Sequence, residues 1–160
     1  MLRLTKKADY GLMALKHLAE HPAGLAQSAK DIAEAYHIPT PLLAKILQTL
    51  TRSGLVVSHA GIHGGYSLAK PANQITAYEV IRSIEGPLFI ASCTTSHGDC
   101  DLLSSCTVKE PLRKLNDTIR DLLSDMRISD LCEESKAAGF TRAAHANQLV
   151  TLNHSMSNRA

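Results

Sequence analysis

The most constraining stretch of the sequence lies between residues 28 and 70, where two short helical patterns meet at a tight turn and lead into a glycine-rich hairpin. Ser28, with Asp31 three residues later, resembles a capping box and predicts a helix of about two turns. Pro39 lacks an N–H group and disfavours the helical conformation at the preceding residue, so this first helix ends before it. The pattern predicts a winged helix-turn-helix.

The second helix of this pair has an apolar and a polar side. We expect it to begin at Thr40, which can cap it, with Pro41 at its first position, and to end at Gly54. Threonine, lysine, glutamine and arginine side chains match the hydrogen-bonding groups of DNA bases and phosphates, so the polar side is expected to enter the major groove of duplex DNA. The apolar side carries Leu43, Ile46, Leu47 and Leu50, and the polar side carries Thr40, Lys45, Gln48, Thr49 and Arg52.

Two strand-like runs follow, at residues 55–58 and 66–69. Gly61, Gly64 and Gly65 lie in the turn between them and are expected to supply the positive φ angles that a hairpin needs. A hairpin in this position is a wing, which is expected to lie along the DNA backbone.

Basic residues also crowd the start of an earlier helix, which Thr5 can cap and which is expected to run to about Glu20. This cluster is either a solvated helix end or a set of phosphate contacts. The residues predicted to contact DNA are Arg3, Lys6, Lys7, Ser28, Thr40, Pro41, Lys45, Gln48, Arg52, His59 and His63.

Charge and aromatic content narrow the choice of partners. The net charge of +2 says little alone, but residues 1–90 hold nine Lys and Arg against six Asp and Glu, while the remainder holds eight against nine. With two Phe, four Tyr and no Trp, a stacking platform for single strands is not expected, so the expected partner is double-stranded DNA. The sequence shows no glycine-rich phosphate loop and no nucleophile–base arrangement, so we do not expect an enzyme.

The cysteines indicate a reducing compartment and a reactive segment. The sequence has no run of about 18 apolar residues and no secretory signal pattern, so we expect a cytoplasmic protein that does not contact a membrane. Its four cysteines are then expected to be thiolates, metal ligands or redox sensors rather than disulfides. Cys132 is expected to be structural or exposed.

Three cysteines, Cys93, Cys100 and Cys106, lie in residues 91–107, a stretch without helical or strand periodicity. Loops this long usually have a function. Thiolates hold iron–sulfur clusters. A zinc site that includes His97 is a chemical rival, although zinc sites favour closer cysteine pairs. The C-x6-C-x5-C spacing alone leaves a cluster, zinc and incidental thiols open.

A helix is predicted over residues 108–132, opened by a capping box of Thr107 and Glu110. Apolar side chains recur along it at steps of three and four, which is coiled-coil spacing and favours a dimer helix over packing on its own domain. A shorter helix, capped by Thr76 and Glu79, is expected to close the first domain. In the helix over residues 108–132, the apolar residues predicted to form the seam between the two protomers are Leu112, Leu115, Ile119, Leu122 and Met126.

The predicted fold class is therefore mainly α with a small β wing. The expected organisation is a winged helix-turn-helix DNA-binding domain at 1–90, a cysteine loop at 91–107, a dimerisation helix at 108–132 and a flexible tail at 133–160.

These features together resemble the Rrf-type winged-helix regulators that include IscR and NsrR. The resemblance rests on LRLTKKADYGL, HIPTPLLAKILQTLTRSGLV, GGYSLAK and the three-cysteine loop, and it covers about residues 1–132. It implies a homodimeric transcription regulator that binds pseudo-palindromic DNA. It also implies an iron–sulfur cluster held by Cys93, Cys100 and Cys106, either [4Fe-4S] or [2Fe-2S].

Two branches of the family use different residues as the fourth ligand of the cluster. IscR-like proteins have a histidine three residues after the last loop cysteine, where this sequence has Lys109. NsrR-like proteins use an acidic residue of the first helix, reached across the dimer, and Asp9 in LTKKADY matches it. Asp9 is the preferred ligand, and the alternatives are His97, Asp99 and Asp101.

The same resemblance suggests two regulatory roles. GPLFIASC and CDLLSSC are most similar to regulators of the Suf cluster-assembly operon, whereas a carboxylate ligand is similar to nitric-oxide sensors. A DNA-binding or partner-binding module without a cofactor is the alternative from another class. At the wing tip the sequence has Ala60-Gly61 in place of the Arg-Gly pair that is frequent in the family, which leaves His59 or His63 to replace the arginine.

Overall fold

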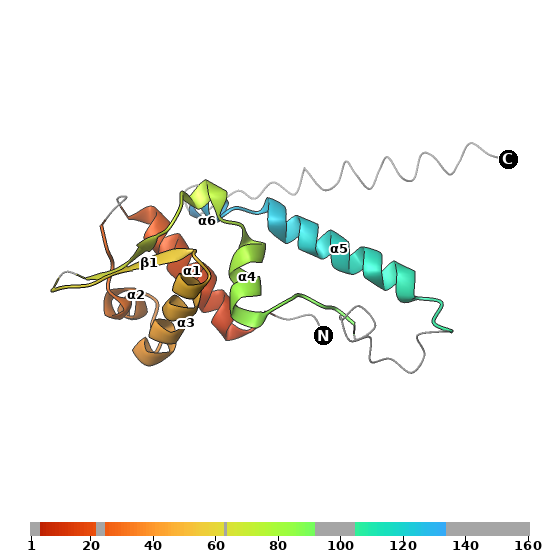
Figure 1. Ribbon diagram of the computed structural model, residues 1–160, viewed down its shortest axis with the longest axis horizontal. Helices are drawn as coiled ribbons and strands as arrows, with labels where there is room; N and C mark the ends of the chain where they lie inside the picture. The colour runs from red at the N-terminus through yellow and green to blue at the C-terminus, as the bar shows by residue number, and fades with distance from the viewer. Residues whose placement is uncertain (1–3, 22–24, 63, 92–104, 134–160) are drawn as a thin grey trace.

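The computed structural model describes residues 4–21, 25–62, 64–91 and 105–133. Over these residues the chain forms a small winged domain from which one long helix projects (Figure 1). The mainly helical fold with a two-stranded antiparallel sheet confirms the predicted fold class. No helix in the described ranges is both long and apolar enough to span a membrane. The elements in chain order are α1 (Lys6–Glu20), α2 (Ala29–Ala35), α3 (Thr40–Arg52), β1 (Val56–His59), β2 (Gly65–Leu68), η1 (Ala72–Gln74), α4 (Ala77–Glu85), α5 (Lys109–Asp125) and α6 (Ile128–Glu133).

Three helices begin at the caps that the sequence predicts. The side chains of Thr5 and Ser28 accept hydrogen bonds from the N–H groups of Ala8 at 3.4 Å and Asp31 at 3.0 Å, respectively. Thr76 forms a complete capping box with Glu79 at the start of α4. Each cap satisfies an N–H group that a helix start leaves without a partner within the helix.

The turn between α2 and α3 differs from the prediction at its last residue. His37 takes a φ of 54°, and the Ile38 N–H group returns to the Ala33 carbonyl at 2.9 Å. Pro39, not Thr40, caps α3, and it does so without a side-chain hydrogen bond. The expected cap at Thr40 is therefore wrong: Thr40 is the first helical residue and Pro41 the second.

The end of α3 follows the glycine signal. Gly54 has a φ of 72°, its N–H group donates to the Thr51 carbonyl at 3.0 Å, and the Leu55 N–H group donates to the Leu50 carbonyl at 3.0 Å. These two bonds form a Schellman motif, which terminates the helix and turns the chain into β1.

The wing is anchored to the segment before α2. Strands β1 and β2 pair antiparallel from Val56 opposite Leu68 to His59 opposite Gly65. Gln27 and Tyr66 then exchange two backbone hydrogen bonds, of 2.9 and 2.8 Å, which attach β2 to the helix-turn-helix.

Only one of the three wing glycines serves the expected purpose. Gly61 has a φ of 116°, whereas Gly64 and Gly65 do not take positive φ angles. Gly65 is needed for close approach instead, because a Cβ atom there would lie 2.5 Å from the Gln27 carbonyl oxygen.

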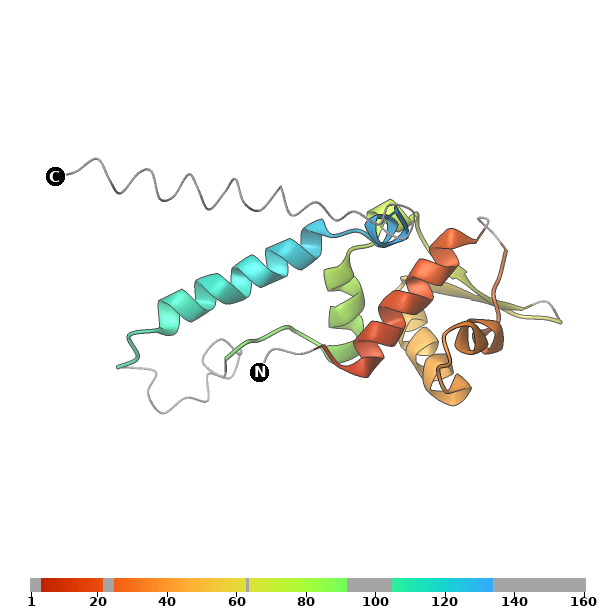
Figure 2. The same ribbon diagram turned by 180° about the vertical axis from the view of Figure 1, so that it is seen from behind.

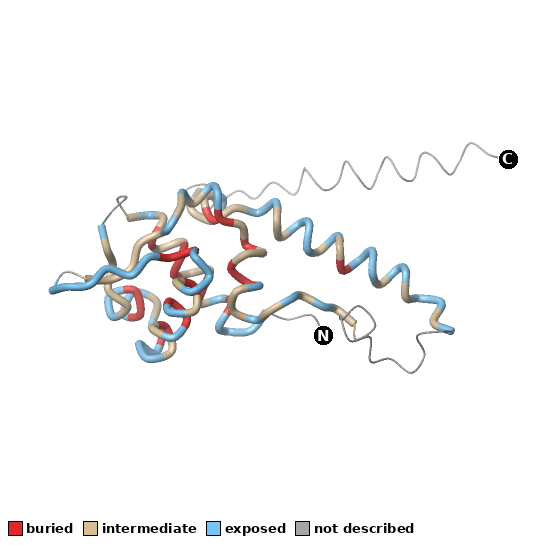
Figure 3. The backbone as a smooth tube through the Cα atoms, viewed as in Figure 1, coloured by how far each residue is buried: buried red, intermediate tan, exposed pale blue. Residues whose placement is uncertain are grey.

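The hydrophobic core lies inside the winged domain (Figure 3). The four apolar side chains predicted for the inner face of α3 are all buried, as are Leu15 and Leu18 of α1. Ile128, at the start of α6, is also fully buried in this core. The C-terminal end of the described chain therefore closes the winged domain.

The predicted helix over residues 108–132 is two helices, α5 and α6. Between them, Met126 accepts a hydrogen bond from the Ala77 N–H group at 2.9 Å, and the Ile128 N–H group donates to the Ile75 carbonyl at 3.0 Å. These bonds break the helix so that Ile128 enters the core. The expected capping box at Thr107 is wrong, because Val108 caps α5 without a side-chain bond.

Candidate nucleic-acid interface and cysteine segment

Helix α3 presents a polar surface to solvent. Lys45, Gln48 and Arg52 are exposed, as is Thr40 at its start. Thr49 is half-buried and its hydroxyl donates to the Lys45 carbonyl at 3.0 Å, so its hydrogen-bonding capacity is partly used within the helix. The predicted DNA-contacting side chains of α3 are thus accessible to solvent, except for Thr49.

The start of α1 lies beside this face. Lys7 of α1 and Lys45 of α3 line the same surface hollow of about 260 Å³, with Leu42, Ile46, Thr49 and Ile84. Two ammonium groups, from α1 and α3, therefore lie around one hollow. Lys6 is also exposed, and Arg3 lies outside the described residues.

The remaining predicted DNA contacts fall into two groups. Ser28 caps α2 and donates from its hydroxyl to Asp31 at 2.7 Å, so its side chain is engaged in the helix start. His59 is exposed on the wing, and one ring nitrogen lies 2.8 Å from the Ser67 hydroxyl. Pro41 is exposed at the start of α3, and His63 lies outside the described residues.

Sequence reasoning missed the apolar character of the wing tip. Ile62 is fully exposed, next to Gly61 at the end of the hairpin. An isolated exposed aliphatic residue is common on protein surfaces, so we assign it no role. The nearest unusual feature in the sequence is Ala60-Gly61, which stands where an Arg-Gly pair is frequent in the family.

The predicted cluster ligands are only partly within the described residues. Asp9 is exposed in the first turn of α1, and Cys106 is a half-buried free thiol just before α5. Figure 1 shows the starts of α1 and α5 separated within one chain. Cys93 and Cys100 lie outside the described residues, and within those that are described no three His, Cys, Asp or Glu side chains gather to hold a metal ion.

The chemistry of this donor set fits an iron–sulfur cluster. Three thiolates match the usual ligands of such clusters, and an exposed carboxylate is a hard ligand suited to iron. Lys109, in place of the histidine of IscR-like proteins, is half-buried at the start of α5 and has no neutral ring nitrogen to offer. Cys132, which the sequence predicts to be structural or exposed, is half-buried on α6, where its thiol donates to the Ile128 carbonyl at 3.4 Å.

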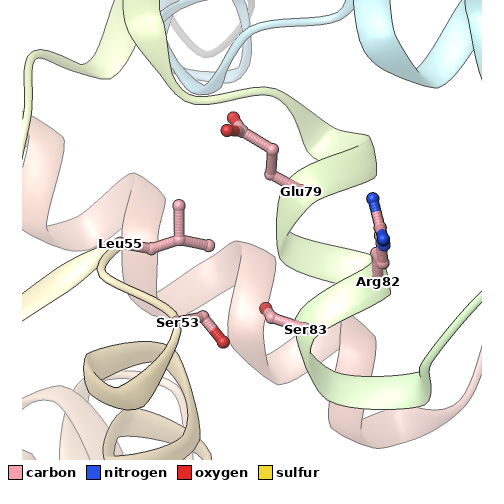
Figure 4. A pocket seen from close by; sticks show the side chains of 5 residues that line it. All are labelled: Ser53, Leu55, Glu79, Arg82 and Ser83. Atoms are coloured by element: carbon pink, nitrogen blue, oxygen red, sulfur yellow. The ribbon is translucent and has the colours of Figure 1, made fainter.

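A second hollow, of about 250 Å³, lies between the end of α3 and α4 (Figure 4). Ser53 and Ser83 donate to carbonyls of their own helices, at 3.2 and 2.8 Å. Glu79 binds Lys70 at 2.9 Å and caps α4. Burial alone would raise the pKa of Glu79, but its bonds to the Thr76 N–H group and to Lys70 outweigh that effect and lower it. These hydrogen bonds serve the fold.

Comparison with known proteins decides the family. Residues 4–134 match Rrf2, which is described as an iron-dependent transcriptional regulator. The chain belongs to the Rrf2 family. A curated relative, protein aau3 of Rhizobium meliloti (strain 1021), is 34% identical over 140 residues, which is 87% of this chain and 90% of that protein.

Solved Rrf2-type structures agree with the fold. CymR (YrzC), the global cysteine regulator of B. subtilis, matches with a TM-score of 0.70 and 27% identity over 83% of this chain and 98% of its own. T. potens IscR matches with a TM-score of 0.69 and 26% identity over 91% of this chain and 96% of its own. The protein is therefore an Rrf2 transcription regulator that binds DNA through its winged domain, and it is not an enzyme.

Proposed function

We propose that this Rrf2 protein is a homodimer whose affinity for promoter DNA depends on an iron–sulfur cluster. Cys93, Cys100 and Cys106 of one protomer and Asp9 of the partner subunit would hold the cluster. The observation that carries the proposal is the three-cysteine segment, which joins the DNA-binding domain to α5 in a family described as iron-dependent. When bound, the cluster supplies iron that oxidants or nitric oxide can attack, and a carboxylate ligand makes it easier to lose than four thiolates would.

Helix α5 supports the homodimer. Leu115, Leu122 and Met126 are 49, 47 and 38% exposed, and they recur on one side of the helix. Leu112 and Ile119, which the sequence also placed in the seam, are half-buried. An apolar row along a projecting helix is suited to pairing with a second copy. A two-fold pair would present two α3 helices to half-sites about 34 Å apart in a pseudo-palindrome.

Residues of α1 connect the proposed cluster to DNA. Asp9 and Lys7 lie in the first turn of the same helix, and Lys7 shares a hollow with Lys45 of the recognition helix. With Asp9 held by the partner subunit, α1 and α3 keep a fixed position relative to the other protomer. Release of Asp9 frees the domain to move and weakens simultaneous binding of both half-sites.

The cofactor is tested by anaerobic purification with measurement of iron and sulfide. We expect a brown wild-type protein, a matched Cys132→Ser control that retains iron and sulfide, and a Cys100→Ala variant that lacks both. A colourless wild-type protein that still binds DNA would contradict the proposal.

The proposed targets are the genes of Suf-type cluster assembly, on the basis of the GPLFIASC and CDLLSSC segments. Footprinting on such promoters should show a two-fold protected site. The carboxylate ligand favours nitric-oxide sensing as the alternative signal, and loss of the footprint on nitric oxide addition at constant iron supply would distinguish the two.

A regulator without a cofactor is the second candidate. One observation favours it, namely Lys109 at the position of the IscR-like histidine. It predicts that Cys100→Ala leaves DNA affinity unchanged.

A further inference from the structure

Helix α5 is an exposed helix with a buried amide near its centre. Asn116 is 8% exposed, and no other polar or charged residue in the described ranges is buried. Leu112 and Ile119, one turn before and one turn after Asn116, are half-buried. The side of α5 that faces its own chain is therefore centred on an amide group.

Asn116 binds the backbone of the segment that leaves α4. Its Oδ1 atom accepts a hydrogen bond from the Ile90 N–H group at 3.1 Å. Figure 2 shows the segment after α4 running toward the N-terminal half of α5. In the sequence, Ile90 stands three residues before Cys93, and Cys106 stands three residues before Lys109, the first residue of α5. The bond thus joins the chain before the first cysteine to the helix that follows the last one.

Packing alone does not explain an asparagine at this position. Burying an amide costs free energy unless its hydrogen bonds are made, and a leucine of similar size would fill the space without that cost. What the amide adds is the bond to the Ile90 N–H group, which would otherwise lose a partner where it is partly buried.

We infer that Asn116 is a positioning residue for cluster retention. It holds the backbone before the cysteine segment against α5, so that the chain enters the segment from a fixed point relative to Cys106. This inference rests on the proposed function. The removal of the amide would let the two ends of the segment separate more often, and the cluster would be lost faster.

The test compares Asn116→Leu, which removes the acceptor, with Asn116→Asp, which keeps an oxygen at the same place. Thr118→Ala is the matched control, because the Thr118 hydroxyl donates only within its own helix, to the Lys114 carbonyl at 2.9 Å. Each protein is loaded anaerobically, and the bleaching of its visible absorption by an iron chelator is timed. We expect Asn116→Leu to bleach roughly 3- to 10-fold faster than wild type, with Asn116→Asp and Thr118→Ala close to wild type.

Hydrogen exchange at the Ile90 amide, measured on cluster-free protein, should rise in Asn116→Leu and return toward wild type in Asn116→Asp. If circular dichroism shows that Asn116→Leu does not fold, Asn116→Ala takes its place in both measurements. A wild-type protein that holds a cluster while the acceptor-free variant bleaches at the wild-type rate overturns the role of Asn116 and leaves the proposed function standing. A wild-type protein that holds no iron overturns the proposed function itself.

Discussion

Individual residues set how closely the wing approaches the helix-turn-helix. Gly65 lies where β2 passes the backbone of Gln27, and the paired hydrogen bonds of Gln27 and Tyr66 hold the two segments together. Backbone atoms cannot swing aside as the end of a flexible side chain can. The position of the wing relative to the helix-turn-helix therefore depends on a missing Cβ atom.

The Gly65→Ala substitution should separate the wing from the segment before α2. A Cβ atom would lie 2.5 Å from the Gln27 carbonyl oxygen, so the strands must shift. We expect a loss of about 1 to 3 kcal/mol in the free energy of unfolding, together with weaker DNA binding. Chemical denaturation and a DNA titration measure both effects. Ser58→Ala, at an exposed position of β1, is the control. If the two variants have equal stability and DNA affinity, close packing at Gly65 is not what positions the wing.

A stacked histidine near the end of α1, His17, is expected to make stability depend on pH. The rings of His17 and His21 stack at 4.2 Å, and His17 meets Tyr36 edge-on at 5.6 Å. Burial, followed by the neighbouring His21, lowers the pKa of His17, and its Nε2 atom is buried without a hydrogen-bond partner in the described residues.

Because the folded-state pKa of His17 is depressed, the unfolded chain binds its proton at a higher pH than the folded chain does. The stability from neutral His17 is fully present above the unfolded pKa, near 6.5, and is lost as the pH falls through the lower folded value. The loss should be about 1 kcal/mol or less. Urea unfolding from pH 7.5 to 5 measures it. His17→Phe should flatten this part of the profile, and an unchanged slope in that variant would assign the dependence to other groups.

Among the helices and strands, the helix starts and the sheet could be predicted from the sequence where they depend on neighbouring residues. The caps at Thr5, Ser28 and Thr76 depend on residues within one turn, and so does the glycine that ends α3. The break between α5 and α6 could not be predicted, because it depends on bonds to residues 75 and 77 and on burial of Ile128 in a distant core. Likewise, the crowding that requires Gly65 arises only when β2 meets the chain before α2.

In the candidate site, too, the features set by local sequence could be predicted and the long-range contacts could not. The polar face of α3 follows from helical periodicity, so Lys45, Gln48 and Arg52 could be predicted as accessible side chains. The proximity of Lys7 to Lys45 and the bond between Asn116 and Ile90 join elements far apart in the sequence. The periodicity of a single helix or strand does not show which distant residues it will contact.

The exposed row of α5 leads to a prediction about assembly. Replacing Leu115 and Leu122 together with lysine would place charges in the proposed seam, where they would lose hydration without gaining partners. We expect the dimer to dissociate and DNA affinity to fall, because a monomer engages only one half-site. Sedimentation gives the mass. The control carries Thr118→Lys and Asp121→Lys, which add two lysines at exposed polar positions of α5. If the Leu115 and Leu122 double variant remains dimeric, the dimer contact lies elsewhere.

In the whole molecule, the long helix and the DNA-binding face are connected through α4. The N-terminal end of α4 bonds to the junction of α5 and α6 through Ala77 and Met126, at 2.9 Å. The C-terminal end of α4 bonds to the start of α1, where the Thr5 N–H group donates to Glu85 at 3.0 Å. The bonds of α4 therefore link the end of α5 to the start of α1, which carries both Asp9 and Lys7.

The most direct test of cluster-dependent binding is DNA affinity measured anaerobically on one preparation, first loaded and then after removal of iron. We expect the loaded and iron-free wild-type protein to differ about 5- to 150-fold in DNA affinity, the range typical of coupled sites. In Asp9→Ala this difference should shrink, because the carboxylate that joins the two protomers is gone. Equal affinities for loaded and iron-free wild-type protein, with the dimer intact in both states, would contradict the account.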